Sequence, residues 1–250
     1  MALFKSGNPA LKEKIFTGLE RAADPENAMT IQGTVNKTFF LLLSVFIPAL
    51  YTWNLFETTL DFSKVAPYFF IGFIGAFIVG IVIAFNKKLA SYLAFVYAVL
   101  EGLALGGLSA IMESSYPGIV VQALMLTFGI LAVLLFIYKL EIIKVTENFK
   151  LIVASATGGI ALFYLISFGL SFFGIHVPLI NDNSIGGIIF SIFVVIVAAM
   201  NLVVDFDFIE QGAAKQVPKY MEWYSAFGIM VTLVWLYIEI LRLLSKTRSR

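Results

Sequence analysis

The sequence predicts an all-α membrane protein with seven transmembrane helices. Of its 250 residues, 60% are hydrophobic and only 13% are charged, whereas a soluble domain has about 45–50% apolar and about 25% charged residues. Seven runs approach or reach the roughly 20 apolar residues that a helix needs to cross the hydrocarbon core of a bilayer. These runs lack the alternating pattern of a transmembrane β-strand.

Each run is interpreted as a helix because backbone polar groups inside lipid must bond within their own segment. The connections are short, such as Asn86–Lys88 between the second and third spans, and the largest loop is expected at Asp205–Trp223. Pro48 and Gly158-Gly159 are isolated, so broken helices are not indicated. The predicted spans are Thr38–Tyr51 with a start nearer Thr34, Val65–Phe85, Leu89–Met112, Gly118–Tyr138, Leu151–Phe173, Gly186–Val204 and Tyr224–Leu244.

Residues 1–30 differ from the rest of the chain, because they carry charges of both signs and no long apolar run. They are predicted to form a polar cytoplasmic arm, and a cleavable signal peptide is excluded. Leu11, Ile15, Phe16 and Leu19 fall on one helical face. A short helix on the membrane surface and a solvated tail are equally compatible with this pattern. Residues 31–250 then form one seven-helix domain.

The basic residues predict an N-terminus in the cytoplasm, since Lys and Arg gather in cytoplasmic loops. Lys64 and four residues of the C-terminus fall on the opposite side: Arg242, Lys246, Arg248 and Arg250. Twelve basic residues fall on the N-terminal side: Lys5, Lys12, Lys14, Arg21, Lys37, Lys87, Lys88, Lys139, Lys144, Lys150, Lys215 and Lys219.

Several classes of function are excluded by residues that the chain lacks. It has no cysteine and a single histidine, His176, which excludes disulfides, thiol nucleophiles and a histidine-based metal site. The formal net charge of +1 offers no basic surface for nucleic acid. Signature motifs of phosphate-binding loops, zinc proteases and serine hydrolases do not occur. We therefore expect no enzyme activity and no cofactor.

Glu101 lies at the middle of the third span, where insertion scales put the cost of a charge at about 2.5–3.5 kcal/mol. Small residues recur every four positions beside it: Ala94, Ala98, Gly102, Gly106 and Ala110. Such a stripe lets another helix approach closely, so Glu101 is expected to point into the bundle. It is either a protonatable or cation-binding group on a pathway, or a neutral acid hydrogen-bonded to a neighbouring helix.

Two further acids, Asp205 and Asp207, are expected to close the sixth span. Their spacing points them in nearly opposite directions, and Asn201, four residues before Asp205, favours Asp205 as the one that faces the bundle. Acids at a helix end can also simply lie among lipid headgroups. On the seventh span, Glu239 and Arg242 have the spacing of an ordinary ion pair near the outer interface.

Three stretches resemble the Bax inhibitor family of seven-span membrane proteins, in particular its bacterial branch. They are Glu101–Gly106 with Tyr116–Ala123 after it, Asp205–Gln211, and Leu236–Leu244 with the ending Ile240-Leu241-Arg242-Leu243-Leu244. The resemblance extends from about residue 30 to the end of the chain. It implies six helices packed around a central seventh, a pH-sensitive calcium leak, and a bacterial inner membrane as the location.

In that family an Asp at the inner end of the sixth span pairs with an Asp in the seventh, and the pair shares a proton. Asp205 matches the first position. The second falls near Thr232, so the standard pair is not present here. Glu101 or Asp207 could substitute for the missing carboxyl, or Lys87 or Lys88 could neutralise Asp205, and the sequence does not choose among them.

The leading hypothesis is a pH-regulated cation leak in which Ca²⁺ permeates and Asp205 and Glu101 bind or gate it, with the bilayer, Ca²⁺ and protons as partners. Asp207 is a further candidate, and Asn201, Glu239, Lys87 and Thr232 are secondary ones. The alternative is a regulator that transports nothing and binds another membrane protein, such as a protease or a cell-death or stress factor. A proton-coupled carrier of small solutes ranks third.

Overall fold

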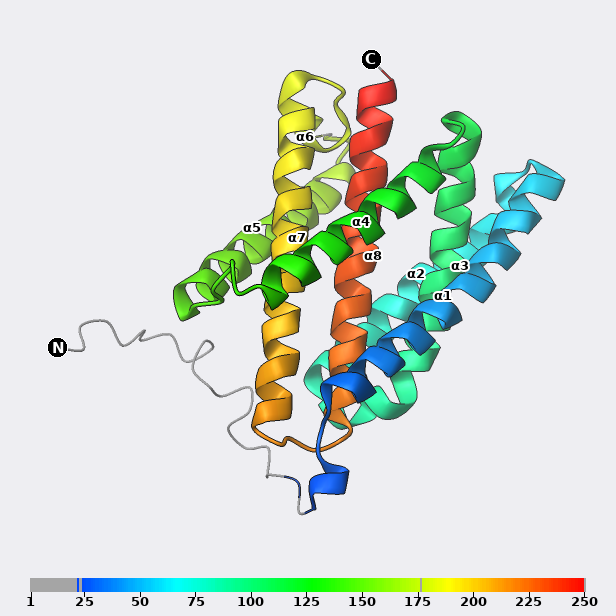
Figure 1. Ribbon diagram of the computed structural model, residues 1–250. Helices are drawn as coiled ribbons and strands as arrows, with labels where there is room; N and C mark the ends of the chain where they lie inside the picture. Colours follow the sequence, from blue (N-terminus) through cyan, green and yellow to red (C-terminus); the bar gives the residue numbers. More distant parts are fainter. Residues whose placement is uncertain (1–21, 23, 176, 250) are drawn as a thin grey trace.

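The computed structural model describes residues 22, 24–175 and 177–249, and the predicted surface helix near residues 11–19 lies outside this part (Figure 1). Seven of the described helices are long and apolar enough to cross a membrane, which confirms the predicted fold class. They are α1 (Ile31–Thr59), α2 (Phe62–Phe85), α3 (Ala90–Ser115, preceded by the 3₁₀ turn η3, Lys87–Leu89), α4 (Ile119–Lys139), α5 (Glu147–Ser171), α7 (Ile185–Ala214) and α8 (Met221–Arg248). Short turns complete the fold: η2 (Pro25–Asn27) and α6 (Pro178–Asn181).

Two predicted spans are much longer in the structure. The first was expected to end at Tyr51, but α1 begins at Ile31 and continues to Thr59, with Pro48 accommodated inside it. The sixth was expected to end at Val204 and to be followed by a long loop. Instead, α7 continues to Ala214, because helices do not stop where the membrane does. Asp205 and Asp207 therefore lie inside a helix, and only residues 215–220 separate α7 from α8.

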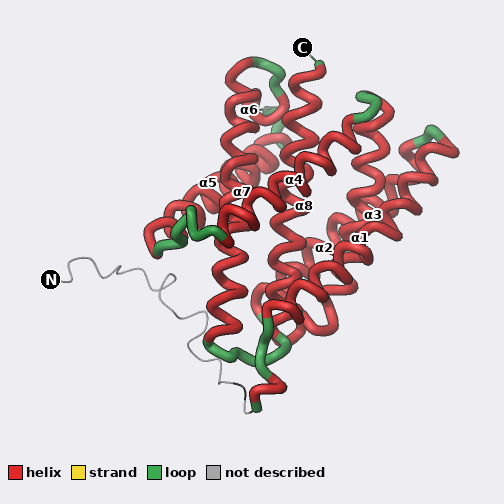
Figure 2. Tube along the Cα trace, in the orientation of Figure 1, coloured by secondary structure: helices red, strands yellow, loops and turns green. Residues whose placement is uncertain are grey.

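Helix α8 lies in the middle of the bundle (Figure 1). In its most apolar window 61% of the residues are buried, against 44% or less in the other six spans. It packs directly against α1, α3, α4 and α7, while α2 packs mainly on α3 and α5 mainly on α7. Figure 2 shows that helices and their connecting turns make up the drawn fold.

The stripe of small residues on α3 is the surface on which α1 packs. Ala94, Ala98 and Ala110 are buried there. A Cβ atom on Gly106 would lie 2.1 Å from the carbonyl oxygen of Ala49 and 2.2 Å from the hydroxyl of Thr52. The backbones of the two helices thus meet at a distance that only glycine permits, as the spacing of the stripe predicts.

Glu222, in the first turn of α8, holds the beginning of α1. It is 1% exposed, and its Oε1 accepts hydrogen bonds from the backbone nitrogen and the hydroxyl of Thr30, both at 2.9 Å. Lys37 of α1 forms an ion pair with it. Donors at a helix N-terminus favour a carboxylate, so the first and last spans are joined at this end of the bundle.

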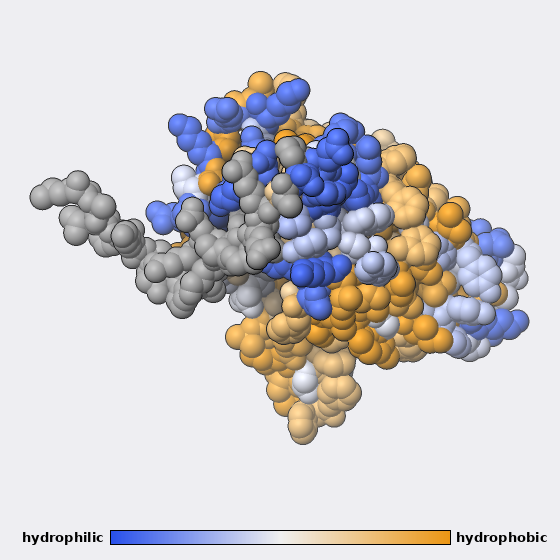
Figure 3. All heavy atoms as spheres, turned by 90° about the horizontal axis from the view of Figure 1, so that it is seen from below, coloured by the Kyte–Doolittle hydropathy of each residue, from blue (hydrophilic) through white to orange (hydrophobic). Residues whose placement is uncertain are grey.

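The outer surface of the spans is apolar, as expected for contact with lipid. Phe73 and Phe77 of α2 are 60% and 62% exposed. Figure 3 shows hydrophobic residues over the flanks and polar residues gathered on the end seen from below. The abundant phenylalanines therefore cover lipid-facing helices, and large exposed apolar areas of this kind fit a membrane and not water.

The close approach at Gly106 predicts a cost for adding a single methyl group. Gly106→Ala should destabilise the purified protein in detergent by about 1–3 kcal/mol, because the α1 backbone must move away. Gly129→Ala is the matched control, since nothing lies within 4 Å of its added Cβ, and it should be neutral or stabilise by up to about 1 kcal/mol. Thermal or denaturant unfolding measures both. Equal stability of the two variants would contradict this account of the interface.

Candidate functional site

Asp205 of α7 faces Thr232 of α8. The hydroxyl of Thr232 donates to Oδ2 of Asp205 at 2.7 Å and also lies 3.1 Å from the carbonyl oxygen of Gly228. Asp205 is partly buried and Thr232 is 9% exposed. A Cβ atom on Gly228 would lie 3.9 Å from Oδ1 of Asp205, so the two helices are close here. The position implied by the family for a second Asp is thus occupied by a hydroxyl that contacts Asp205 directly.

A second polar contact joins the same two helices 14 residues away. Lys246 of α8 donates to the hydroxyl of Ser191 of α7 at 3.0 Å. The helices are antiparallel, so Asp205 with Thr232 and Ser191 with Lys246 define one register. Halfway between them, the register places Ala198 opposite Glu239.

One further heptad beyond Asp205, the register places Gly212 opposite Ser225. These four layers together are called the polar seam. Each layer pairs one residue of α8 with one of α7: Ser225 with Gly212, Thr232 with Asp205, Glu239 with Ala198, and Lys246 with Ser191. From Ser225 to Lys246 the seam rises by 21 residues along α8, or about 32 Å at about 1.5 Å per residue, close to the thickness of a hydrocarbon core of about 30 Å. Ser225 is 4% exposed, and its hydroxyl has no hydrogen-bond partner among the described residues. Polar groups therefore recur across the whole depth of the bundle.

Glu239 is buried, with 2% exposure, so its carboxylate lies inside the bundle and does not reach the surface as a snorkelling side chain would. The predicted ion pair is present, since Nη1 of Arg242 lies 2.8 and 2.9 Å from its two carboxylate oxygens. Tyr164 of α5 donates to Oε1 of Glu239 at 3.0 Å and lies 2.7 Å from Arg242. Arg242 and Tyr164 thus supply partners for the buried carboxylate, while the side chain of Arg242 itself is 29% exposed.

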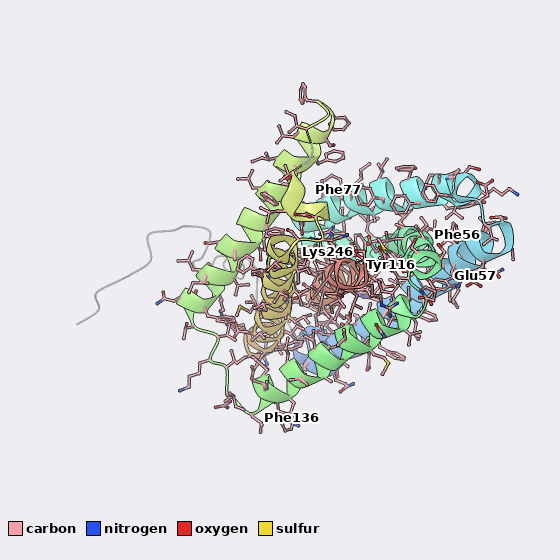
Figure 4. All side chains as sticks on the ribbon, turned by 90° about the horizontal axis from the view of Figure 1, so that it is seen from above. Phe56, Glu57, Phe77, Tyr116, Phe136 and Lys246 are labelled. Atoms are coloured by element: carbon pink, nitrogen blue, oxygen red, sulfur yellow. The ribbon has the colours of Figure 1, made fainter. Side chains whose placement is uncertain are left out.

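Lys246 was not singled out from the sequence, yet it is 3% exposed. Figure 4 labels it between α7, α8 and the α6 segment. Its ammonium donates to the carbonyl oxygens of Leu179 at 3.1 Å and Gly187 at 3.0 Å, besides Ser191. The heptad spacing from Thr232 and Glu239 was the available signal. A basic residue near the end of a span has the pattern of an ordinary interfacial anchor, so the burial of Lys246 was not predicted.

Asp207 and Asn201 lie on other faces of α7. Asp207 forms an ion pair with Lys150 of α5 at 2.8 Å and accepts from Gln211. Asn201 donates to the hydroxyl of Thr157 of α5 at 2.8 Å. Asp205 and Asp207 thus point in different directions, as their spacing predicts. Asn201, however, does not share the face of Asp205, because Asn201 faces α5 while Asp205 faces α8.

Glu101 lies on the opposite side of α8 from Asp205. Its hydrogen-bond partner is Tyr97, one turn earlier on α3. Tyr97 packs edge-on against Phe227 of α8 with ring centroids 4.9 Å apart, and Ser109, two turns after Glu101, lies 2.7 Å from the hydroxyl of Tyr237. Phe227 and Tyr237 are on the face of α8 away from Thr232, so α8 separates the two carboxyls.

Lys87 reaches the same end of α8 as Asp205. Its ammonium lies 5.6 Å from the ring centroid of Tyr224, which precedes Gly228 by one turn. Tyr224 is close enough to Asp205 for the charge of the carboxylate to act on its hydroxyl. The hydroxyl of Thr232 and the phenol of Tyr224 therefore lie near Asp205, and the ammonium of Lys87 lies beyond the phenol.

No group of three or more His, Asp or Glu side chains gathers around one point within the described part of the chain. A cavity of about 840 Å³ lies between α1, α4 and α7 and is bordered by Asp207 and Glu210. A second of about 380 Å³ is apolar and reaches Ser109 and Tyr237. A third of about 270 Å³ reaches Tyr164. Asp205 and Glu101 line none of these three, so the seam is packed in this conformation.

The comparison with protein families agrees with the geometry. The family model described as Bax inhibitor 1 like matches residues 8–249, nearly the whole chain. No curated protein and no solved structure matches it. Its seven apolar helices and this match show that the chain is a multi-pass membrane protein that belongs to the Bax inhibitor 1 like family.

Proposed function

We propose that the protein is a pH-regulated cation leak, with Ca²⁺ as a permeant ion and without a catalytic role. The observation that carries the proposal is the hydrogen bond between Thr232 and Asp205 in the polar seam. A carboxylate inside an apolar bundle is costly, and such groups mark ion or proton pathways more often than they serve packing. Carboxylate oxygens are also among the ligands that Ca²⁺ prefers.

Protonation of Asp205 is the proposed trigger. A hydrogen bond to a carboxylate is charge-assisted and stronger than one to a neutral acid, so uptake of a proton weakens the link between α7 and α8. The packed seam then represents the closed state, and flux rises as the pH falls. Among the described residues, Tyr224 is a titratable group near Asp205, and Lys87 lies over the ring of Tyr224.

Glu101 is proposed as a second acid on the pathway, acting from the α3 side of α8. Its contact with Tyr97, which packs on Phe227, connects its protonation state to the packing of α3 against α8. Since α8 separates Glu101 from Asp205, the two acids would contribute independently.

The N-terminal side is proposed to face the cytoplasm of a bacterial cell, across its inner membrane. Twelve basic residues favour this orientation. Three of the four C-terminal basic residues weigh little against it, because their charges are engaged within the protein. Arg242 pairs with Glu239, Lys246 is buried, and Arg248 donates to the carbonyl oxygens of Tyr116 and Pro117.

A regulator without transport is the second candidate, and the cavity between α1, α4 and α7 favours it. Its walls include apolar residues such as Leu131 and Leu135, while Lys139, Glu141 and Lys144 lie at its polar edge. A helix of another membrane protein could dock there. This function requires no flux from purified protein in liposomes, and a specific partner that is lost when the cavity is filled by a larger side chain.

The proposed trigger predicts that Asp205→Asn removes the part of the pH dependence of the leak that Asp205 supplies. The wild-type protein in liposomes should pass Ca²⁺ faster at mildly acidic than at neutral pH, and the variant, which keeps only Glu101 as a titrating acid on the pathway, should show a weaker dependence on pH. At neutral pH the Ca²⁺ flux of Asp205→Asn should exceed that of the wild type by about 5-fold to about 100-fold, as expected for the loss of one charge-assisted bond. Asp207→Asn is the matched control and should keep the wild-type profile. An Asp205→Asn profile identical to wild type would remove the mechanism.

The hydroxyl of Thr232 is predicted to act through Asp205 and not independently. Thr232→Val keeps the shape of the side chain but loses the donor, so flux at neutral pH should rise by a similar factor. The double variant with Asp205→Asn should leak no faster than either single variant, because both remove the same bond. Fluorescent Ca²⁺ dye in liposomes measures all three, and additive effects would show that the bond is not the gate.

A further inference from the structure

Three oxygen atoms surround the buried ammonium of Lys246. They are the carbonyl oxygens of Leu179 and Gly187 and the hydroxyl of Ser191, at 3.0–3.1 Å. No carboxylate of the described residues lies within 4 Å of this nitrogen. A buried ammonium is usually paired with an acid, so this one is held as a free cation would be, by oxygen atoms alone.

Two of the three oxygen atoms belong to the backbone, and the contacts that hold this backbone do not involve Lys246. A Cβ atom on Gly187 would lie 2.1 Å from the carbonyl oxygen of Asp182 and 3.5 Å from that of Leu179, so the α6 segment rests directly on the first turn of α7. The carboxylate of Asp182 accepts from the nitrogen of Ser184 at 3.0 Å, and the hydroxyl of Ser184 caps α7 at Gly187. The arrangement therefore persists when the lysine side chain is shortened.

The charges that act on this nitrogen are Glu239 and Arg242 from α8 and Asp182 from the segment before α7. Without the lysine, two acids and one base remain. Removal of the ammonium thus leaves three oxygen atoms without the cation that they surround, and carbonyl oxygens are among the ligands that a small cation such as Ca²⁺ takes.

We propose that the oxygens of Leu179, Gly187 and Ser191 form a cation site that the protein fills with its own ammonium. The class of ligand is an alkali or alkaline-earth cation, and Lys246 takes its place. The ammonium closes this end of the polar seam to cations from solution. That last consequence rests on the proposed leak function, whereas the existence of the site does not.

The site predicts that a metal cation can replace the lost ammonium. Lys246→Ala should unfold at a lower temperature than wild type in N-methylglucamine chloride. In KCl, NaCl or CaCl₂ of equal ionic strength, at least one cation should restore about 4 °C with saturation, as mass action requires. The melting temperature of the wild type should not distinguish these salts.

The controls separate a specific site from general screening. Lys64→Ala removes an exposed lysine and should show no cation preference. Adding Ser191→Ala to Lys246→Ala removes one oxygen ligand and should raise the required cation concentration at least several-fold. Lys246→Ser gives a second test if the alanine variant does not fold. No rescue of either variant by any of the cations would overturn the proposal.

Liposome flux tests the consequence for the leak. Lys246→Ala should pass Ca²⁺ roughly tenfold faster than wild type at neutral pH, the factor that corresponds to about 1.4 kcal/mol. If the cations restore the melting temperature but neither protein passes Ca²⁺, the site stands and the leak function fails. Faster flux without any cation rescue would instead leave the leak function standing and remove the site.

Discussion

The need to satisfy polar groups inside lipid governs the contact between α7 and α8, because unpaired ones cost several kcal/mol in hydrocarbon. Three of the four layers of the polar seam meet this need, with help from α5 and the α6 segment. A hydroxyl donates a hydrogen bond to Asp205, a guanidinium and a phenol donate to Glu239, and backbone oxygens accept from Lys246. The remaining neighbours of α8 supply mostly apolar packing. The polar layers thus fix the register of the central helix, which apolar surfaces alone specify weakly.

Composition and run length were sufficient to predict seven spans, because the bilayer selects for length and apolarity so strongly. The stripe of small residues on α3 was readable too, since close packing of helices requires glycine and alanine at fixed intervals. The end of α7 was not readable. Hydropathy falls at Asp205, but the hydrogen bonds of the helix continue to Ala214, so a loss of apolarity was misread as the end of the helix.

For a related reason, only part of the candidate site could be predicted from the sequence. Asp205 could be identified from its own chain neighbours, but its partner is on another helix, and antiparallel register cannot be derived from one sequence without a known contact. Once Thr232 is placed against Asp205, the positions of Glu239 and Lys246 follow by heptads. Lys246 and Glu222 are missed by sequence reasoning because each lies near a helix end, where exposure is the ordinary expectation for a charge.

The central place of α8 has a consequence for biogenesis. It is the last of the seven spans to leave the ribosome, yet it contacts four of the others and carries the carboxylate that holds the start of the first span. Helices α1, α3, α4 and α7 must therefore wait in the bilayer without the neighbour that they share, with Asp205 lacking its Thr232 partner. Assembly of this protein is completed from its C-terminal end, and a nascent chain interrupted before α8 would leave these four helices without their shared contact.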